Sequence, residues 1–272
     1  MSALTDRLDE IKAEGRAALI GYLPVGYPSV EGSIEAMEVM VEAGVDIVEI
    51  GLPYSDPVLD GPVIQFAAEQ ALANGTRIAD VFPAATAVAA TGAPALVMSY
   101  FNPMLQYGVD RFAQDLRSAG GVGVITPDLT PDSGAEWIAA ADAHGLDKIF
   151  LVAPSSTTER LHLTVNATTG FVYAASLMGV TGERATVGDA AESLVRNTRA
   201  AGAPRVCVGL GVTTGAHAAQ VARYADGVIV GSALVRCLTE NESLDAGLAA
   251  LRVKVQELAA GVRAVRVRGE TL

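Results

Sequence analysis

A regular alternation of short apolar runs with longer helical stretches constrains the fold of this chain more than any other feature. Most of the runs are almost entirely hydrophobic, which is typical of parallel strands buried on both faces. The eight runs that we interpret as strands are residues 18–23, 46–50, 95–99, 121–126, 148–152, 171–175, 205–209 and 227–230. The helical patterns between them are residues 34–43, 62–73, 78–90, 109–119, 133–144, 158–167, 189–200, 214–223 and 244–258.

Strand–helix alternation repeated eight times predicts an α/β fold of the (β/α)8 TIM-barrel type, here with an extra N-terminal helix over residues 4–13. Half of the residues are hydrophobic and 18% are charged, so the chain can bury a large core. Barrels of about 250 residues form one domain, and we therefore expect a single barrel domain over residues 1–272. A doubly wound open sheet is the alternative. It often has a Gly-rich turn after its first strand, where this chain has Pro24-Val25-Gly26-Tyr27-Pro28.

Charge and hydropathy exclude several classes of partner. The net charge of −12 makes the chain a poor binder of nucleic acid. The apolar runs are shorter than about ten residues, and a membrane span needs about twenty. The N-terminal segment is charged and lacks the apolar region of a signal peptide. Cys207 and Cys237 lie in apolar contexts and read as buried free thiols, so we expect a cytoplasmic protein.

Two carboxylates near the second strand are the main candidates for chemistry. Glu49 interrupts an apolar strand, and alternation places its side chain opposite Val48 and Ile50, pointing into the upper barrel. Burial there would raise its pKa and suit it to proton exchange near neutral pH. Asp60 ends the long loop that follows and could face the same pocket as an acid/base partner. The structural alternatives are a Glu49–Arg pair, a helix cap at Asp60 and a turn role for Asp56.

Glycines follow the last three strands and indicate a phosphate site. The segments are Gly179-Val180-Thr181-Gly182, Gly209-Leu210-Gly211 and Gly231-Ser232-Ala233. Barrels often bind phosphate with the loops after strands seven and eight and the N-terminus of a short extra helix. The alternative is that these glycines only permit close packing. Residues 228–234 also resemble flavin phosphate sites, so this feature alone does not define a reaction.

Lysine and histidine positions argue against two other chemistries. Lys12 and Lys254 lie in terminal helices, and Lys148 begins the fifth strand at the wrong end of the barrel for a Schiff base. The histidines, all in helical segments, form no metal-ligand pattern with one another, so we expect no metal. Any carbon–carbon cleavage here would depend on proton transfer alone.

Residues 48–61 (VEIGLPYSDPVLDG) closely resemble the signature of the tryptophan synthase alpha chain family. Supporting matches are SYFNP at 99–103, PDL at 127–129, GVTG at 179–182, GLG at 209–211 and GSA at 231–233. The resemblance extends from about residue 21 to residue 235. It implies a lyase that cleaves indole-3-glycerol phosphate to indole and glyceraldehyde 3-phosphate.

The resemblance also implies roles for individual residues. Glu49 matches the family's general acid/base, Asp60 its second catalytic carboxylate and Tyr173 a tyrosine that lines the site. The phosphate-binding positions are matched by Gly182, Gly211, Gly231 and Ser232. The residues expected to line the indole pocket are Leu23, Ile64, Tyr100 and Leu129.

The partner implied by the resemblance is the tryptophan synthase beta chain, in an α2β2 heterotetramer that passes indole directly into tryptophan synthesis. No cofactor is expected in this chain, and pyridoxal phosphate is expected in the beta chain. We expect the loop 53–60, with Pro53, Asp56 and Pro57, to contact that partner, although it could serve only as an active-site lid. Two other classes stay open at this point: another phosphate-binding barrel, such as a sugar-phosphate isomerase or flavin oxidoreductase, and a catalytically silent regulatory subunit.

Overall fold

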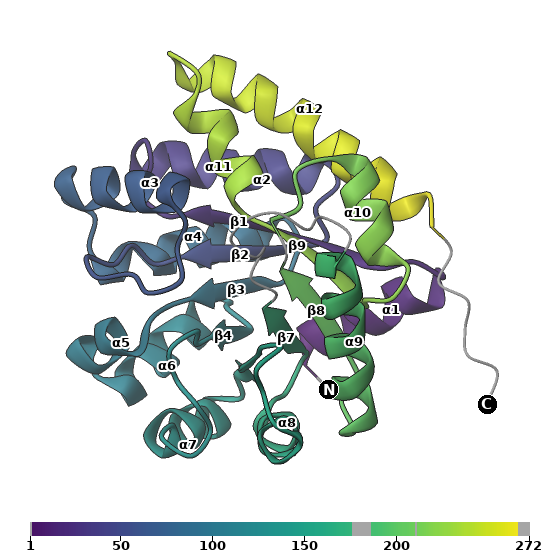
Figure 1. The fold of residues 1–272 in the computed structure, drawn as a ribbon. Coiled ribbons are helices and arrows are strands. Elements are labelled where there is room, and N and C mark those ends of the chain that lie inside the picture. Colours follow the sequence, from purple (N-terminus) through teal and green to yellow (C-terminus); the bar gives the residue numbers. More distant parts are fainter. Residues whose placement is uncertain (1, 176–185, 210, 266–272) are drawn as a thin grey trace.

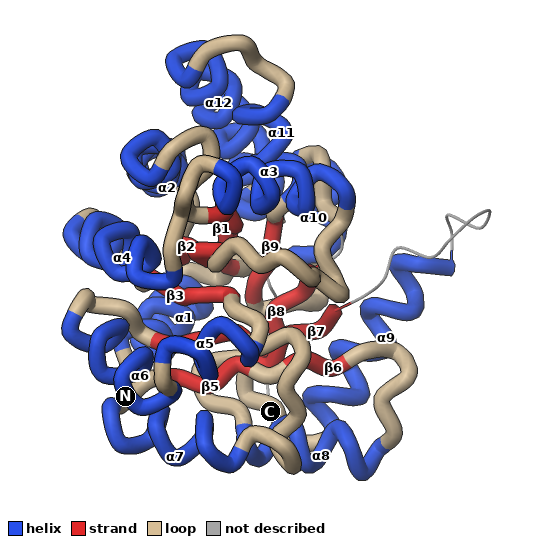
Figure 2. Tube along the Cα trace, turned by 90° about the vertical axis from the view of Figure 1, so that its left-hand side faces the viewer, coloured by secondary structure: helices blue, strands red, loops and turns tan. Residues whose placement is uncertain are grey.

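The computed structural model describes residues 2–175, 186–209 and 211–265. The strands are β1 (Ala18–Pro24), β2 (Ile47–Gly51), β3 (Ala95–Met98), β4 (Gly123–Ile125), β5 (Asp147–Ile149), β6 (Leu151–Val152), β7 (Val172–Ala175), β8 (Val206–Gly209) and β9 (Gly227–Val230). They form one sheet in the order β5-β4-β3-β2-β1-β9-β8-β7-β6, and every neighbouring pair is parallel. Figure 2 shows these strands at the centre with helices around them.

The helices follow the strands in the alternating order that the sequence predicts. They are α1 (Ala3–Ala13), α2 (Val30–Ala43), α3 (Pro62–Ala73), α4 (Val81–Ala90), α5 (Phe101–Tyr107), α6 (Val109–Ser118), α7 (Ala135–His144), α8 (Thr158–Ala167), α9 (Thr186–Ala200), α10 (Gly215–Ala222), α11 (Ser232–Thr239) and α12 (Leu244–Arg263), with a 3-10 turn, η1 (Ile78–Asp80), before α4. Among the described residues, no helix is both long and apolar enough to cross a bilayer.

The barrel closes through the fifth predicted strand, which the structure divides in two. β5 pairs with β4, whereas β6 pairs with β7, so the segment changes partner at Phe150. The Phe150 carbonyl accepts a hydrogen bond from the Tyr173 N–H (3.1 Å), and the Ile149 carbonyl accepts one from the Thr126 N–H (3.2 Å). The two edges of the sheet are therefore consecutive parts of one chain segment. The predicted (β/α)8 barrel is confirmed, and its fifth strand is split because one segment serves two neighbours.

Helix α5 is an element that the sequence pattern did not reveal. Its third residue is Pro103, which a first helical turn tolerates. Its N-terminus is held from a distant loop, because both carboxylate oxygens of Asp128 accept from the Phe101 N–H, at 3.0 and 3.1 Å. A helix of seven residues that depends on such a non-local contact carries little periodic signal of its own.

Helix α1 closes the amino end of the barrel. Its buried residues Leu4, Leu8 and Ile11 join the cluster of inward-facing strand residues that fills the barrel interior. Asp46 fixes the junction, because its buried carboxylate accepts from Arg7 (2.9 Å) and Arg16 (2.7 Å). In Figure 1 the arrows of β1, β2 and β3 point away from α1. Any pocket that reaches the inside of the barrel must therefore open at the carboxyl ends of the strands.

Candidate active site

Glu49 lies inside the barrel, as its place in the strand predicts. Ile47, two residues earlier on β2, belongs to the inward-facing cluster, and strand alternation puts Glu49 on the same face. The side chain is 1% exposed, and its Oε2 atom has no hydrogen-bond partner among the described residues. No described cation neutralises it, so the Glu49–Arg alternative is not supported. A buried carboxyl without a partner is costly, which is a reason to look for a function.

Asp60 stands where the loop after β2 enters helix α3. The N-cap residue of α3 is Gly61, and no side chain caps the helix, so the capping alternative for Asp60 is wrong. Its backbone carbonyl accepts from Gln65 Nε2 (2.7 Å), which leaves the carboxylate free to face the barrel. There the carboxylate lies near Tyr100 and close enough to Glu49 for its charge to act on that group.

The two carboxyl groups have pKa values on opposite sides of neutrality. Burial raises the pKa of Glu49 to about 8, and the negative charge of Asp60 contributes to the rise. Burial also raises the pKa of Asp60, to about 6, while a hydrogen bond from Tyr100 opposes the rise. At pH 7 Glu49 is therefore mainly protonated and Asp60 mainly ionised. Two neighbouring carboxyl groups whose pKa values differ in this way can act as an acid and an anion in one pocket.

Two tyrosines lie beside this pair. Tyr173 on β7 packs against the inward-facing cluster and lies two residues after Phe171, a member of that cluster. Tyr22 on β1 is paired in register with Glu49 on β2. A Cβ on Gly51 would overlap the Tyr22 hydroxyl, and one on Gly209 would overlap the Tyr173 hydroxyl. These glycines therefore make room for the two rings. Burial, followed by nearby carboxylates, raises the pKa of both phenols well above the usual value, so both stay protonated.

Tyr22, and not the expected Leu23, lies beside the two carboxyl groups. Leu23 is fully buried, but it lies on the opposite face of β1 from Tyr22 and Ile20, between the strands and the surrounding helices. This placement does not support Leu23 as a pocket residue. The alternation of side chains along β1 could have predicted this, because it places Ile20 and Tyr22 on the inward face that Glu49 occupies on the next strand.

The other expected pocket residues have different surroundings. Ile64 of α3 points toward Gly231 and the Tyr22 ring at the mouth of the barrel, and Tyr100 is buried beside Asp60. Leu129 is buried in the loop after β4 and packs close to Gly134 of that loop. Met98, Ile125 and Leu151 are inward-facing strand residues that supply apolar surface and were not anticipated.

The expected phosphate site is partly described. Helix α11 begins at Ser232 with Gly231 as its N-cap, and the N–H groups of Leu234 and Val235 donate to the Gly231 carbonyl (2.8 and 3.1 Å). The N–H groups of Ser232 and Ala233 have no acceptor within the helix and can receive an anion. Gly211 is exposed and has φ +60°, a conformation that favours glycine. Gly182 lies outside the described residues.

The loop before Asp60 carries the expected partner residues and exposed apolar side chains. Pro53 is buried, Pro57 is half-buried and Asp56 is exposed. Val58 is 78% exposed and Leu59 is 45% exposed, although both flank the buried site. Solvent-facing hydrophobic residues on a short loop are typical of a contact surface.

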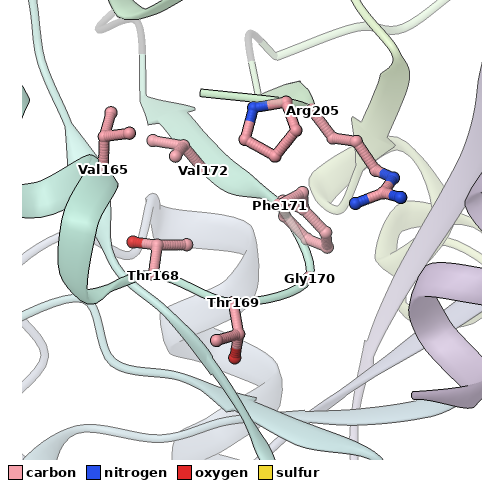
Figure 3. A pocket seen from close by; sticks show the side chains of 8 residues that line it. Val165, Thr168, Thr169, Gly170, Phe171, Val172 and Arg205 are labelled. Atoms are coloured by element: carbon pink, nitrogen blue, oxygen red, sulfur yellow. The ribbon is translucent and has the colours of Figure 1, made fainter. Parts of the chain in front are cut away.

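A second hollow lies at the opposite end of the barrel, near the start of β7 and β8. Figure 3 shows the side chains that line it, among them Phe171 and Arg205. Its volume is about 180 Å³. The Arg205 guanidinium is bound by Asp9 (2.6 Å), and the Thr168 and Thr169 hydroxyls bond to backbone groups. These polar groups are thus used within the protein, and the hollow offers little for a ligand. In the described part of the chain, no group of three or more His, Cys, Asp or Glu residues is placed to hold a metal.

The fold and the site together define a (β/α)8-barrel enzyme of acid–base chemistry. The family model described as tryptophan synthase alpha chain matches residues 8–263. The chain belongs to the tryptophan synthase alpha chain family. The activity of this family, and of this chain, is the lyase reaction of tryptophan biosynthesis that cleaves indole-3-glycerol phosphate to indole for the beta chain.

Relatives support this assignment along nearly the whole chain. The tryptophan synthase alpha chain of Salinispora arenicola is 60% identical, with 97% of this chain and 98% of the relative covered. That of Mycobacterium tuberculosis is 57% identical, with 96% and 95% covered. Tryptophan synthase from M. tuberculosis, solved in an aminoacrylate-bound form, superposes with a TM-score of 0.89 at 54% identity over 97% of this chain and all of that one. Subunit alpha from Legionella pneumophila also gives 0.89, at 32% identity, over 97% of this chain and all of that one.

Proposed function

We propose that Glu49 and Asp60 carry out the cleavage, with Glu49 as general acid/base and Asp60 as the anion that stabilises the ring. The observation that carries this proposal is the pair itself. A fully buried, protonated carboxyl lies beside a second, ionised one at the carboxyl ends of the strands, opposite the end that α1 closes. No other pair of described carboxyl groups combines burial with pKa values raised on both members.

The reaction needs two proton transfers that balance each other. Glu49 donates a proton to C3 of the indole ring, which makes the ring an electron sink. The bond between C3 and the glycerol carbon then breaks, its electron pair restores the aromatic ring, and the adjacent hydroxyl loses its proton as the aldehyde forms. Glu49, now a carboxylate, can accept that proton and return to its starting state. The products are indole and glyceraldehyde 3-phosphate, and no redox step occurs.

Asp60 contributes by charge. The ring nitrogen becomes positive as C3 is protonated, and a carboxylate that accepts its N–H stabilises the transition state more than the ground state. The apolar neighbours Met98, Ile125 and Leu151 lower the local dielectric constant and strengthen this interaction. Tyr173, protonated and beside Glu49, adds a neutral hydroxyl to the wall. For the indole pocket we retain Ile64, Tyr100 and Leu129 and add Tyr22.

The phosphate group of the substrate would bind at the start of α11. The free N–H groups of the first turn and the helix dipole favour an anion there, with Gly231, Ser232 and Gly211 at its edge. Gly182, which lies outside the described residues, is kept as an expected phosphate-binding position. A Cβ on Gly231 would lie 3.3 Å from Tyr22 Cδ1 and 3.5 Å from Ile64 Cδ1, so the phosphate end and the indole end are adjacent. Anchoring the phosphate fixes the position of C3 relative to Glu49.

We also propose the partner, the cofactor arrangement and the location. Val58 and Leu59 on the loop and Leu105 on α5 are exposed apolar residues around the mouth of the site, and they suit docking of the beta chain beside Pro53, Asp56 and Pro57. The assembly would be α2β2, with pyridoxal phosphate held by the beta chain and no cofactor in this one. Two free cysteines fit a reducing compartment such as the cytoplasm. One continuous sheet supports a single domain over residues 1–272.

The test is product analysis with the purified chain and indole-3-glycerol phosphate. Equal amounts of indole and glyceraldehyde 3-phosphate are expected, and added beta chain should consume the indole in the presence of serine. Asp60→Asn is expected to be strongly impaired but not inactive, because the amide oxygen can still accept the ring N–H. Release of indole at the wild-type rate by Asp60→Asn would contradict the role given to Asp60.

A further inference from the structure

Tyr100 connects the loop that carries Asp60 to the rigid part of the barrel. Its hydroxyl oxygen accepts two hydrogen bonds, from the Val58 N–H and the Leu59 N–H, each 3.0 Å long. These are the two residues directly before Asp60. Its ring also packs against Tyr54 of the same loop, with ring centroids 5.1 Å apart and planes tilted by 31°. One side chain therefore holds the loop at both ends.

The backbone of Tyr100 is itself held firmly. The buried Ser99 hydroxyl donates to the Tyr100 carbonyl (2.7 Å). The next N–H, that of Phe101, donates to the Asp128 carboxylate. Tyr100 is 4% exposed and lies two residues after the end of strand β3. The hydroxyl is thus a fixed point supplied by the sheet, against which the exposed loop residues Val58 and Leu59 are ordered.

The direction of the Tyr100 proton follows from counting donors and acceptors. A phenol oxygen has two acceptor sites and one hydrogen. The two loop N–H groups occupy both acceptor sites, so the hydrogen must be donated to another group. The charged acceptors that face it are Asp60 and Asp128. The Asp128 oxygens already accept from the Phe101 N–H, whereas Asp60 directly follows the two residues whose N–H groups bond to the Tyr100 oxygen, so its carboxylate is the remaining charged acceptor beside this hydrogen.

We propose that Tyr100 is a positioning residue for the reaction: it orders the 58–60 segment with its oxygen and keeps Asp60 ionised with its hydrogen. The inference rests on the proposed role of Asp60. The titratable groups that face Asp60 are Glu49 on β2, Tyr22 on β1, Tyr173 on β7 and Tyr100 after β3. Among these described neighbours Tyr100 is the one that opposes the rise that burial causes in the pKa of Asp60.

The experiment is the pH dependence of kcat/KM for indole release by the isolated chain, compared between wild type and Tyr100→Phe. Removing the donor should move the acid limb upward by about one pH unit, because a hydrogen bond to a charged group has about that effect on a pKa. The substrate phosphate also titrates near pH 6, at roughly the same place. That titration belongs to the substrate and cannot move when the enzyme is mutated, so a shift is assigned to the protein.

Tyr107→Phe is the matched control, because Tyr107 lies on α5 and its hydroxyl also donates to a carboxylate, that of Asp115 (2.6 Å). It should leave the acid limb unchanged. In an Asp60→Asn background, Tyr100→Phe should have less than half of its effect on log(kcat/KM), because the residue acts through the charge of Asp60.

Replacement of Tyr100 by 3-fluorotyrosine guards against a folding defect. This residue has almost the same size and is a better proton donor, so the acid limb should move in the opposite direction, to lower pH. An unmoved acid limb in both Tyr100 variants would overturn the inference. If Asp60→Asn is severely impaired while the Tyr100 variants behave as wild type, only this inference fails. If Asp60→Asn is itself fully active, the proposed function fails first.

Discussion

Glu49 shows at the scale of one residue how function can oppose stability. Its carboxyl is enclosed by apolar strand residues without a neutralising cation among the described groups, and burial keeps it protonated up to a pKa of about 8. In the unfolded chain the same group ionises near its ordinary pKa of 4.5. The folded state therefore holds a proton that the unfolded state has released over the range between these two values.

Glu49→Gln should consequently gain stability over wild type as the pH rises. Below about pH 4.5 both states of the wild type hold the proton, and the full contribution of this group is present. Between pH 4.5 and about 8 the wild type loses it progressively, by a few kcal/mol in total, whereas glutamine does not titrate. Urea unfolding at several pH values measures the difference. Asp60→Asn should show the same trend, but it should level off near pH 6. A difference for Glu49→Gln that does not change with pH would contradict the assigned burial effect.

Gly51 is small because the Tyr22 ring occupies the space that a side chain would need. Gly51→Ala should destabilise the protein by about 1–3 kcal/mol, as overpacking does, and should displace the ring from its place beside Glu49. Thermal unfolding and indole release measure the two effects. The double variant Gly51→Ala/Tyr22→Leu should lose much less stability than the sum of the single changes. If the losses of stability of the two single variants add up fully in the double variant, the Tyr22 ring does not restrict the size of residue 51.

The residues to which we assign the chemistry were predictable in unequal degree. Glu49 could be found because one charge in an apolar strand is conspicuous, and strand alternation gave its direction. Asp60 lies in an irregular loop, where its capping alternative could be rejected only from the three-dimensional contacts. Tyr22 was missed because an aromatic residue in a strand is usually read as core. Its neighbour across the sheet, Glu49, reveals its importance only once the register is known.

At the scale of elements, strand and helix order were predictable and partner exchange was not. The alternation located all eight strand positions, and the helices at 62–73 and 158–167 have the expected bounds. The split at Phe150 and the short helix α5 depend on contacts from distant parts of the chain. Local propensity contains no information about such contacts, which is why both differ from the prediction.

Helix α11 allows a direct test of the phosphate site. Gly231→Asp places a side chain next to Tyr22 and Ile64 and adds a negative charge where the helix N-terminus would receive the anion. Affinity for glycerol phosphate, measured by calorimetry, should fall strongly. Gly231→Asn has nearly the same size without the charge and should weaken binding less. Equal affinity in wild type and Gly231→Asp would place the phosphate elsewhere.

At the scale of the whole molecule, the barrel has one closed end and one open end. Helix α1 and the Asp46 ion pairs seal the amino end, and the exposed apolar loop residues surround the other. Substrate entry, catalysis and partner docking would therefore share one face. This arrangement suits an enzyme whose small apolar product is passed to a second protein.

Docking of the beta chain at this face can be tested with one substitution at two places. Val58 is 78% exposed on the loop before Asp60, and Val253 is 67% exposed on α12. Val58→Asp should weaken binding of the beta chain at least tenfold and reduce its stimulation of indole release, because it introduces a charge into an apolar contact. Val253→Asp should bind normally. Equal effects of the two variants would move the interface away from the loop.

The central claim is that the buried carboxyl of Glu49 transfers the proton that breaks the carbon–carbon bond. The most direct measurement is the rate of indole release by Glu49→Gln at pH 7, with folding verified by its thermal transition. Glutamine preserves the shape of the side chain but cannot donate or accept the proton. We expect a folded protein with turnover lower by about 10²–10⁴-fold. A folded Glu49→Gln variant that keeps more than about a tenth of the wild-type turnover would contradict it.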